Sequence, residues 1–394
     1  MGDSLFCDPE RIDSGAMEQT QPEISNRIEA LRRRMKEEEI DAYLVPGTDP
    51  HQSEYPPEHF HCRHWLTGFY GSAGTLVVTA EDAGLWTDSR YFLEAEKQLE
   101  GTPITLFRMD TPGVPDYGEW LESCLGQGQV LSFDSRLVSL ATAHTLEDRL
   151  EPKGVEVRPG PDLLKEIWSD RPELPASPIY LHEDRYAGES AESKLQRLRS
   201  ALAERGADTM LATALDEVAW LLNLRGSDVR YNPVFLSYLM ISPDNVDLFV
   251  DESKLSGEAS AHLERLDVRT RRYSEAEVAF EELSPQCTVL VDPARLSTML
   301  AASLPEGVGR VRALSPITEM KAIKSEAQIR GIESAMRRDG AALANFFRRL
   351  EAEVEAGNGP SEIEAGELLR EYRAAGELFV SESFNTIAGY GANG

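Results

Sequence analysis

Apolar positions along the first part of the chain follow the spacing of a helix and then of short strands. Ile24, Ile28, Leu31 and Met35 are four, three and four residues apart, so they share one face of a helix expected over 23–39. The apolar run at 41–46 is typical of a buried strand. Alternating helices and strands predict an α/β sheet. Further strands are expected at 74–79, 83–87, 104–107 and 129–133, and further helices at 91–98, 140–150 and 162–167.

A second region repeats this order of elements. Prolines at 172, 175 and 178 interrupt the pattern before it begins again. Residues 197–208 resemble residues 27–41 in kind, because each stretch leads from a helix through an aspartate into a short apolar strand. A duplicated α/β domain is plausible, with one copy at 23–172 and the other at 173–316, but the sequence identity is weak and the internal repeat alone does not establish it. In the second copy, helices are expected at 192–205 and 217–223, and strands at 209–212, 235–241, 246–250 and 288–291.

A third region, 317–394, differs from the first two. Helices are expected at 325–353 and 361–374, and a strand at 379–388. Ser361 is placed as an N-cap, and Glu364 three residues later completes a capping box. Two helices and a strand cannot enclose a core of their own. We expect this region to be the incomplete start of a larger domain.

Charge and composition exclude several classes of partner. The 394 residues have a formal net charge of −28, which argues against binding to nucleic acid or to an anionic membrane. Only eight of the 40 basic residues are lysines. An acidic surface poor in lysine suits a salt-rich cytoplasm, although codon bias produces the same ratio.

The N-terminus and the cysteines indicate a cytoplasmic setting. Residues 1–22 are acidic and have no apolar core, so we expect a disordered tail and no secretory signal. No apolar run approaches the roughly 20 residues of a membrane span. The cysteines form no CxxC pair, which favours reduced, individually placed thiols; they are Cys7, Cys62, Cys124 and Cys287.

Several motifs follow one another in a fixed order. The first region contains DAYLVPGTDPHQSEY at 41–55, Arg63, LTGFYGSAGT at 66–75 and LWTDSRYF at 85–92. In this order, and with the later motifs, the chain resembles aminopeptidase P, the Xaa-Pro aminopeptidases, in their long three-domain form. The later motifs are LDEVAWLLNLRGSD at 215–228, YNPVF at 231–235, MKAIKSE at 320–326 and FNTIAGYGANG at 384–394.

The resemblance implies a fold and a chemistry. The fold would be two creatinase-like N-terminal α/β domains followed by an α+β pita-bread catalytic domain, of which 317–394 is the start. Two manganese ions would be held by two Asp, one His and two Glu, and their bridging hydroxide would attack the peptide bond before a proline. Those ligands would follow the turn at 391–394, so the resemblance assigns no metal ligand and no catalytic residue here. We expect a truncated, inactive chain whose complete form binds Xaa-Pro peptides as a homodimer.

One substrate-binding residue is implied by the resemblance. The family's Trp-Thr-Asp-Gly-Arg motif places an arginine at the substrate entrance, and Arg90 matches it. A guanidinium binds peptide carbonyls or a carboxylate through a planar fork. The alternative is a surface ion pair between Arg90 and Asp88. Ser89 stands where the family usually has glycine, so a positive φ at that position would strain the turn.

Other clusters of reactive residues have simpler interpretations. Ser72 lacks the surrounding G-x-S-x-G of a nucleophile elbow, and the glycine run 68–74 lacks the lysine of a phosphate loop. A histidine-rich stretch invites a zinc site, but prolines interrupt it and an exposed polar loop is the alternative. His51 and Glu54 are expected to orient this loop or to line the approach to the active site. The stretch contains His51, His59, His61, Cys62 and His64.

Two classes of function remain open from the sequence. The first is a metallopeptidase represented by an incomplete chain. The second is a non-catalytic peptide-binding or scaffold protein built of creatinase-like domains. A scaffold should end in a closed domain, so the unpaired strand expected at 379–388 favours the first class.

Overall fold

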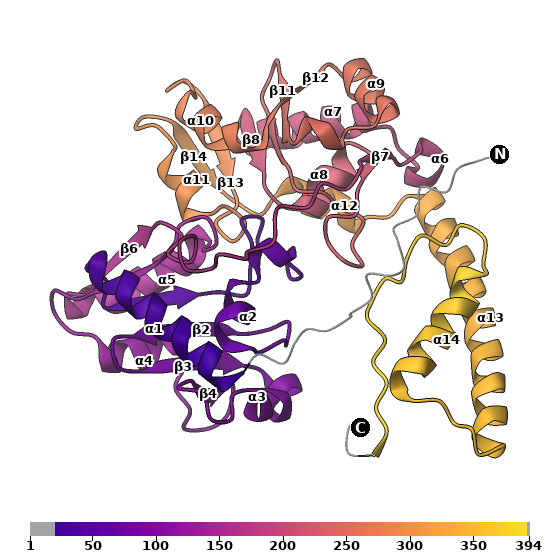
Figure 1. Ribbon diagram of the computed structural model, residues 1–394. Coiled ribbons are helices and arrows are strands. Elements are labelled where there is room, and N and C mark those ends of the chain that lie inside the picture. The colour runs from indigo at the N-terminus through magenta and orange to yellow at the C-terminus, as the bar shows by residue number, and fades with distance from the viewer. Residues whose placement is uncertain (1–19, 392–394) are drawn as a thin grey trace. The chain divides into compact units, whose positions relative to one another are not determined.

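The computed structural model describes residues 20–391 and contains two compact units (Figure 1). The first unit comprises the described residues up to Leu174 together with Ala294–Ala302. The second comprises Pro175–Pro293 and the residues from Ser303 onward. The tail expected at 1–22 lies outside the described residues except for its last three, and helix α1 already begins at Gln21. Within the described residues, no helix has both the length and the apolar character needed to cross a lipid bilayer.

The first unit is built on a six-stranded sheet with the order β4-β3-β2-β1-β5-β6. All strands except β2 run in the same direction, because β2 is antiparallel to both of its neighbours and the other pairs are parallel. The strands are β1 (Ala42–Val45), β2 (Thr75–Thr79), β3 (Ala83–Thr87), β4 (Thr105–Arg108), β5 (Val130–Asp134) and β6 (Glu156–Gly160). The helices are α1 (Gln21–Glu37), α2 (Cys62–Thr67), α3 (Phe92–Gln98), α4 (Tyr117–Cys124), α5 (Leu140–Leu150) and α11 (Thr298–Ala302).

The second unit contains a sheet of the same topology. Its order is β12-β11-β10-β8-β13-β14, and β10 is the single antiparallel strand, as β2 is in the first sheet. The predicted duplication is therefore confirmed by the pairing of the strands. These are β8 (Thr209–Ala212), β10 (Tyr238–Ile241), β11 (Val246–Val250), β12 (Val268–Arg272), β13 (Thr288–Val291) and β14 (Gly309–Arg312).

Helices and a short second sheet surround the strands of the second unit. The two-stranded sheet pairs β7 (Tyr180–Leu181) with β9 (Leu224–Arg225) in antiparallel register. The helices of this unit up to residue 322 are α6 (Asp184–Ala187), α7 (Ala191–Glu204), α8 (Leu215–Leu221), α9 (Gly257–Arg265), α10 (Ala276–Glu281) and α12 (Pro316–Ala322).

Burial explains why the central elements could be read from the sequence. The predicted apolar face of α1 is buried, with Ile24, Ile28, Leu31 and Met35 each at most 2% exposed. Strand β1 is buried at every position, as expected for a strand covered on both faces of a parallel sheet. Apolar residues of the sheet and of the helices beside it then form one core, including Leu44, Val77, Trp86, Phe133 and Leu146.

Three of the strands that the sequence missed lie at the ends of the two large sheets, and the other two, β7 and β9, form the short second sheet. Strands β6, β12 and β14 pair on one side only, and apart from buried Val268 they consist of partly buried and exposed residues. Because an edge strand needs few apolar side chains, sequences such as VRTRR and GRVR do not predict a strand by hydrophobicity.

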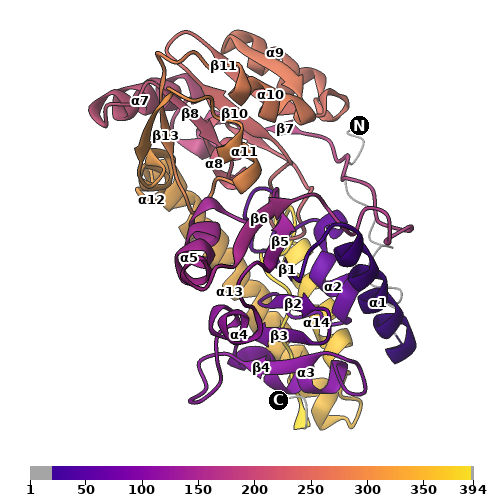
Figure 2. The same cartoon turned by 90° about the vertical axis from the view of Figure 1, so that its left-hand side faces the viewer.

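The third region forms two long helices that lie side by side (Figures 1 and 2). Helix α13 (Glu326–Glu355) and helix α14 (Glu362–Ala374) match the predicted positions. The predicted capping box of α14 is confirmed: the Glu364 amide donates to Ser361 Oγ at 3.3 Å, and the Ser361 amide donates to Glu364 Oε2 at 2.8 Å.

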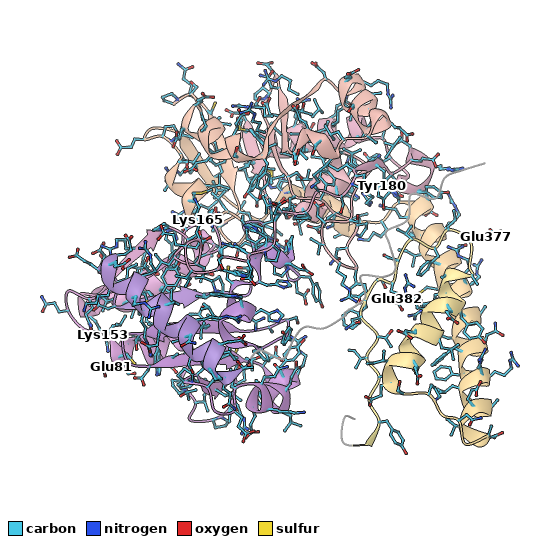
Figure 3. The ribbon with its side chains drawn as sticks, in the orientation of Figure 1. Glu81, Lys153, Lys165, Tyr180, Glu377 and Glu382 are labelled. Carbon is cyan, nitrogen blue, oxygen red and sulfur yellow. The ribbon has the colours of Figure 1, made fainter. Side chains whose placement is uncertain are left out.

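Two predicted elements are wrong. Residues 162–167 form no helix: residues 163–167 form consecutive turns, and the Asp162 carboxylate accepts the Leu164 amide at 3.0 Å and also binds two arginines. Residues 379–388 form no strand, because no strand within 20–391 pairs with them. Side chains hold this segment instead: Glu382, labelled in Figure 3, lies 3.3 Å from Arg373 of α14.

Candidate functional site

A pocket of about 270 Å³ lies in the first unit, where β1 and β5 end and β2 begins. Strands β1 and β5 are parallel neighbours, and the chain continues from β1 to β2 on one side and from β5 to β6 on the other. In α/β sheets, ligands bind at such a switch point, outside the carboxyl ends of the strands. The lining includes Leu44, Pro46, Gly47, Thr48, Gln52, Ser53, Glu54, Ser72, Ala73, Gly74, Thr75, Tyr117, Leu137, Val138, Ser139 and Thr142.

The loop after β1 forms one wall of this pocket and is held by short hydrogen bonds. Asp49 is fully buried, and its Oδ1 accepts the amides of His51 at 2.9 Å and Ser53 at 3.0 Å. Thr48 Oγ1 and Gln52 Nε2 donate to the Leu137 carbonyl at 2.8 and 3.1 Å. The wall is therefore preformed, because the loop is tied both to itself and to the segment after β5. His51 and Glu54 belong to this loop, but only Glu54 lines the pocket.

Arg63 lies behind a second part of the lining. It is 6% exposed, its Nη2 donates to the Gly71 carbonyl, and its guanidinium lies 5.0 Å from the centre of the Phe69 ring. Burial lowers the pKa of Arg63 to about 10. Its Nε and Nη1 have no hydrogen-bond partner among residues 20–391. The sequence showed Arg63 as a motif residue only, and no pattern in the alternating polar stretch marked it as buried.

Polar groups from three segments interact with two residues of the pocket lining, Ser72 and Glu54. Ser72 Oγ, on the lining, lies 2.8 Å from Tyr91 Oη. Ser72 thus lies in the bend before β2 and is hydrogen-bonded to a tyrosine. Burial and the neighbouring Glu54 carboxylate raise the pKa of Tyr55, while the positive charge of Arg90 opposes the rise. The structure therefore brings Arg90 and Glu54 to one area of the first unit.

Arg90 is oriented by the aspartate two residues before it. The Arg90 amide and Nε donate to Asp88 Oδ1 at 3.0 and 2.9 Å, and Nη2 donates to Asp88 Oδ2 at 2.7 Å. This pairing raises the pKa of Arg90 above its ordinary value. The side chain is nevertheless 60% exposed. Ser89 begins a short 3-10 helix and is not among the described residues with positive φ, so the strain considered for it does not arise.

The histidine-rich stretch is divided among separate contacts with the backbone. The His59 ring donates through Nδ1 to the Pro172 carbonyl at 2.7 Å, and the His61 Nε2 lies 3.0 Å from the Pro56 carbonyl. Burial lowers the pKa of both rings. Each of these two ring nitrogens therefore contacts a backbone carbonyl.

The remaining members of the stretch are buried or packed on aromatic rings. His64 packs edge-on against Tyr70 with 3.6 Å between ring centres, and burial lowers its pKa to about 3. Cys62 is buried, which raises its thiol pKa to about 12. In the part of the chain that the structure describes, no group of three or more His, Cys, Asp or Glu side chains could hold a metal ion.

Comparison with known proteins places both sheets in one domain family. Residues 27–167 and residues 170–328 each match the Creatinase/Prolidase N-terminal domain. The chain is 36% identical over 410 residues to "Aminopeptidase P2" of Arabidopsis thaliana, covering 95% of this chain and 58% of that protein. It is 37% identical over 383 residues to "Probable Xaa-Pro aminopeptidase P" of Aspergillus niger, covering 94% of this chain and 62% of that protein.

A solved structure agrees with these relatives. The X-prolyl aminopeptidase of Caenorhabditis elegans, described as a cytosolic enzyme with a di-nuclear active site, superposes with a TM-score of 0.88 at 30% identity. The match covers 92% of this chain and 62% of that one. The protein thus consists of creatinase/prolidase N-terminal domains followed by further helices. It belongs to the aminopeptidase P family, and it spans about three fifths of the length of the relatives it matches.

Proposed function

We propose that this chain forms part of a metallo-aminopeptidase that releases the N-terminal residue from peptides with proline in second position. The observation that carries the proposal is the similarity over 94–95% of this chain to proteins named aminopeptidase P. The similarity extends through both α/β domains and into α13 and α14, so it is not limited to one common domain. We further propose a cytoplasmic homodimer.

The proposed role of Arg90 is to contact the peptide. Its geometry supports that role, because Asp88 fixes Nε and Nη2 while the side chain stays exposed and interacts electrostatically with Glu54 of the pocket lining. A guanidinium held in this way loses little freedom when it binds a peptide carbonyl or a carboxylate. The same hydrogen bonds also fit a surface ion pair between Arg90 and Asp88. Enzyme kinetics of an Arg90 variant distinguish this ion pair from a contact with the peptide.

Two manganese ions are part of the proposal for the complete enzyme. A dinuclear site would polarise the scissile carbonyl and activate water. The side chains of residues 20–391 do not fit such a site, because no group of three or more potential ligands occurs among them. We therefore assign no metal ligand to these residues, and we propose that the 394-residue chain does not hydrolyse Xaa-Pro peptides by itself.

The test compares two proteins on one substrate. The 394-residue chain and the product of the full reading frame are each assayed on Arg-Pro-Pro with added Mn²⁺, with Arg-Ala-Pro as the matched control peptide. Release of the first residue that depends on proline and is removed by chelation is expected from the full product only. Such release by the 394-residue chain would contradict the proposed inactivity. A full product that binds the peptide without cleaving it would favour a peptide-binding scaffold.

A further inference from the structure

The loop 226–236, which joins β9 to β10, has a strained backbone at one residue. Tyr231 has a φ of 65°, in the left-handed region that non-glycine residues seldom adopt and bulky ones adopt least. Such a conformation costs free energy and persists only where the surrounding structure fixes it. Strain of this kind is found mainly where the side chain that it orients has a task. Two questions follow for Tyr231: what holds the backbone, and what the side chain contacts.

Buried contacts hold the loop on both sides of Tyr231. Asp228 is 7% exposed, and its Oδ2 accepts hydrogen bonds from the Leu236 amide at 2.7 Å and from Lys254 Nζ. The Asp228 amide in turn donates to the Val234 carbonyl at 3.1 Å, which joins the two arms of the loop. A buried ion pair and backbone pairing therefore offset the strain at Tyr231.

The Tyr231 side chain contacts a segment that lies far along the chain. We call residues 379–390 the C-terminal segment; they form no helix or strand. Tyr231 Oη donates to Asn385 Oδ1 at 3.0 Å across 154 positions of sequence, and both residues belong to the second unit. Tyr231 is half-buried, whereas Asn385 is exposed. The hydrogen bond thus joins a donor on a fixed loop to a segment without regular structure.

Two other contacts of the C-terminal segment reach α14, the helix that precedes it. Glu382 lies 3.3 Å from Arg373, and the Tyr390 amide donates to Glu362 Oε1 at 2.5 Å. These contacts fix the segment relative to its own neighbour in the chain. The bond from Tyr231 fixes it relative to the loop of the α/β part of the unit, so it supplies a constraint that α14 does not.

We propose that Tyr231 is a positioning residue, which holds the C-terminal segment against the loop 226–236. The left-handed backbone aims the hydroxyl at Asn385, and the buried pair at the base of the loop keeps it there. In the product of the full reading frame, this bond sets the position from which the chain continues past the segment. That last part rests on the proposed function, whereas the bond itself can be tested in the 394-residue chain.

Hydrogen exchange of the 394-residue chain tests the bond. Tyr231→Phe removes the hydroxyl and keeps the ring, so amides of the C-terminal segment should exchange roughly fivefold faster, as expected for the loss of one neutral hydrogen bond. Asn385→Ala should have the same effect, and the double variant should add nothing to either change. Asn385→Asp, which keeps an acceptor, should restore the protection.

A matched control and two outcomes decide this experiment. The control is Tyr186→Phe, which removes the hydroxyl of another partly exposed tyrosine of the second unit and should leave exchange of the segment unchanged. Exchange of the wild-type segment at the rate of an unstructured peptide overturns the proposal. Equal exchange in the wild type and in Tyr231→Phe also overturns it.

Kinetics of the full product test the positioning role. Tyr231→Phe should lower kcat/KM for Arg-Pro-Pro roughly fivefold with unchanged metal content, and Asn385→Asp should stay within about twofold of the wild type. Equal kcat/KM for the wild type and Tyr231→Phe overturns the positioning role. A full product that does not cleave the peptide would contradict the proposed function instead, and hydrogen exchange would still decide whether Tyr231 holds the segment.

Discussion

The two sheets share a topology, but the turns after their equivalent strands do different things. Strand β3 is followed by Asp88 and a 3-10 helix that ends one residue after Arg90, and β11 is followed by Asp251 and a 3-10 helix that ends at Lys254. In each turn the aspartate accepts an amide two residues later. The cation differs: the Arg90 side chain is 60% exposed, whereas Lys254 is 2% exposed and bonded to buried Asp228. The same backbone turn thus exposes a cation in one unit and buries it in the other.

A second comparison lies within the first unit, where the tripeptide Asp-Ser-Arg occurs twice. Asp134 and Arg136 after β5 repeat the bonds of Asp88 and Arg90 after β3, with Nε to Oδ1 at 3.0 Å and Nη2 to Oδ2 at 2.7 Å. Arg136 also reaches Asp162 at 2.8 Å. Arg90 has no second carboxylate in hydrogen-bond contact within the described residues. One copy therefore crosslinks the unit, and the other leaves a fixed guanidinium open to a ligand.

The largest effect is expected from the buried cation of the second unit. Lys254→Met leaves Asp228 buried without its partner, so we expect the free energy of unfolding to fall by about 3–5 kcal/mol. Urea unfolding measures this change. The double variant with Asp228→Asn should recover most of the loss, because it removes the unpaired charge. A loss below about 1 kcal/mol would mean that the buried pair does not hold this turn.

Arg90 should affect catalysis without affecting stability. In an active product of the full reading frame, Arg90→Ala should lower kcat/KM roughly tenfold to a hundredfold, because a charge-assisted hydrogen bond to the peptide is lost. Metal content and melting temperature should stay at the wild-type values. Lys97→Ala, another exposed cation of the first unit, is the control. Unchanged kinetics would leave Arg90 as a surface ion-pair residue.

Arg136 should behave in the opposite way. Arg136→Ala removes contacts to Asp134 and Asp162, so we expect a loss of about 1–2 kcal/mol, reduced by solvent because the side chain is 34% exposed. Thermal unfolding beside Arg90→Ala is the measurement. Equal melting temperatures for the two variants would show that the second carboxylate does not distinguish the two tripeptides.

The last expected effect, similar in size to that of Arg136→Ala, is a dependence of the stability of the first unit on pH. The pKa of His64 is lowered to about 3 by burial, compared with about 6.5 in an unfolded chain. The unfolded state therefore binds more protons between these values, and the stability present above pH 6.5 is lost as pH falls toward 3. We expect a loss on the order of 1–2 kcal/mol at about pH 5, and His64→Phe should reduce this slope. An unchanged slope in hydrogen exchange of β2 amides would exclude His64 as the cause.

The predictable parts of the structure are those governed by neighbouring residues. The apolar face of α1, buried β1 and the capping box at Ser361 all depend on side chains within a few positions of each other. The family motifs placed Arg90 in a turn beside Asp88 for the same reason. The edge strands β12 and β14 were missed because their stability comes from backbone pairing with strands β11 and β13, which their own polar residues do not reveal.

Local periodicity predicted the central helices and strands, and the ordered motifs predicted the family and, through it, the two similar domains. The tertiary structure buries Arg63 beside two glycines and brings Asp162 into contact with two arginines. It also decided that Ala294–Ala302, between β13 and β14, belongs to the first unit, where the Leu140 amide donates to the Leu296 carbonyl at 2.8 Å. The physical reason is common to these cases: burial and charge pairing depend on residues far apart in the chain, and no local pattern encodes which of them will meet.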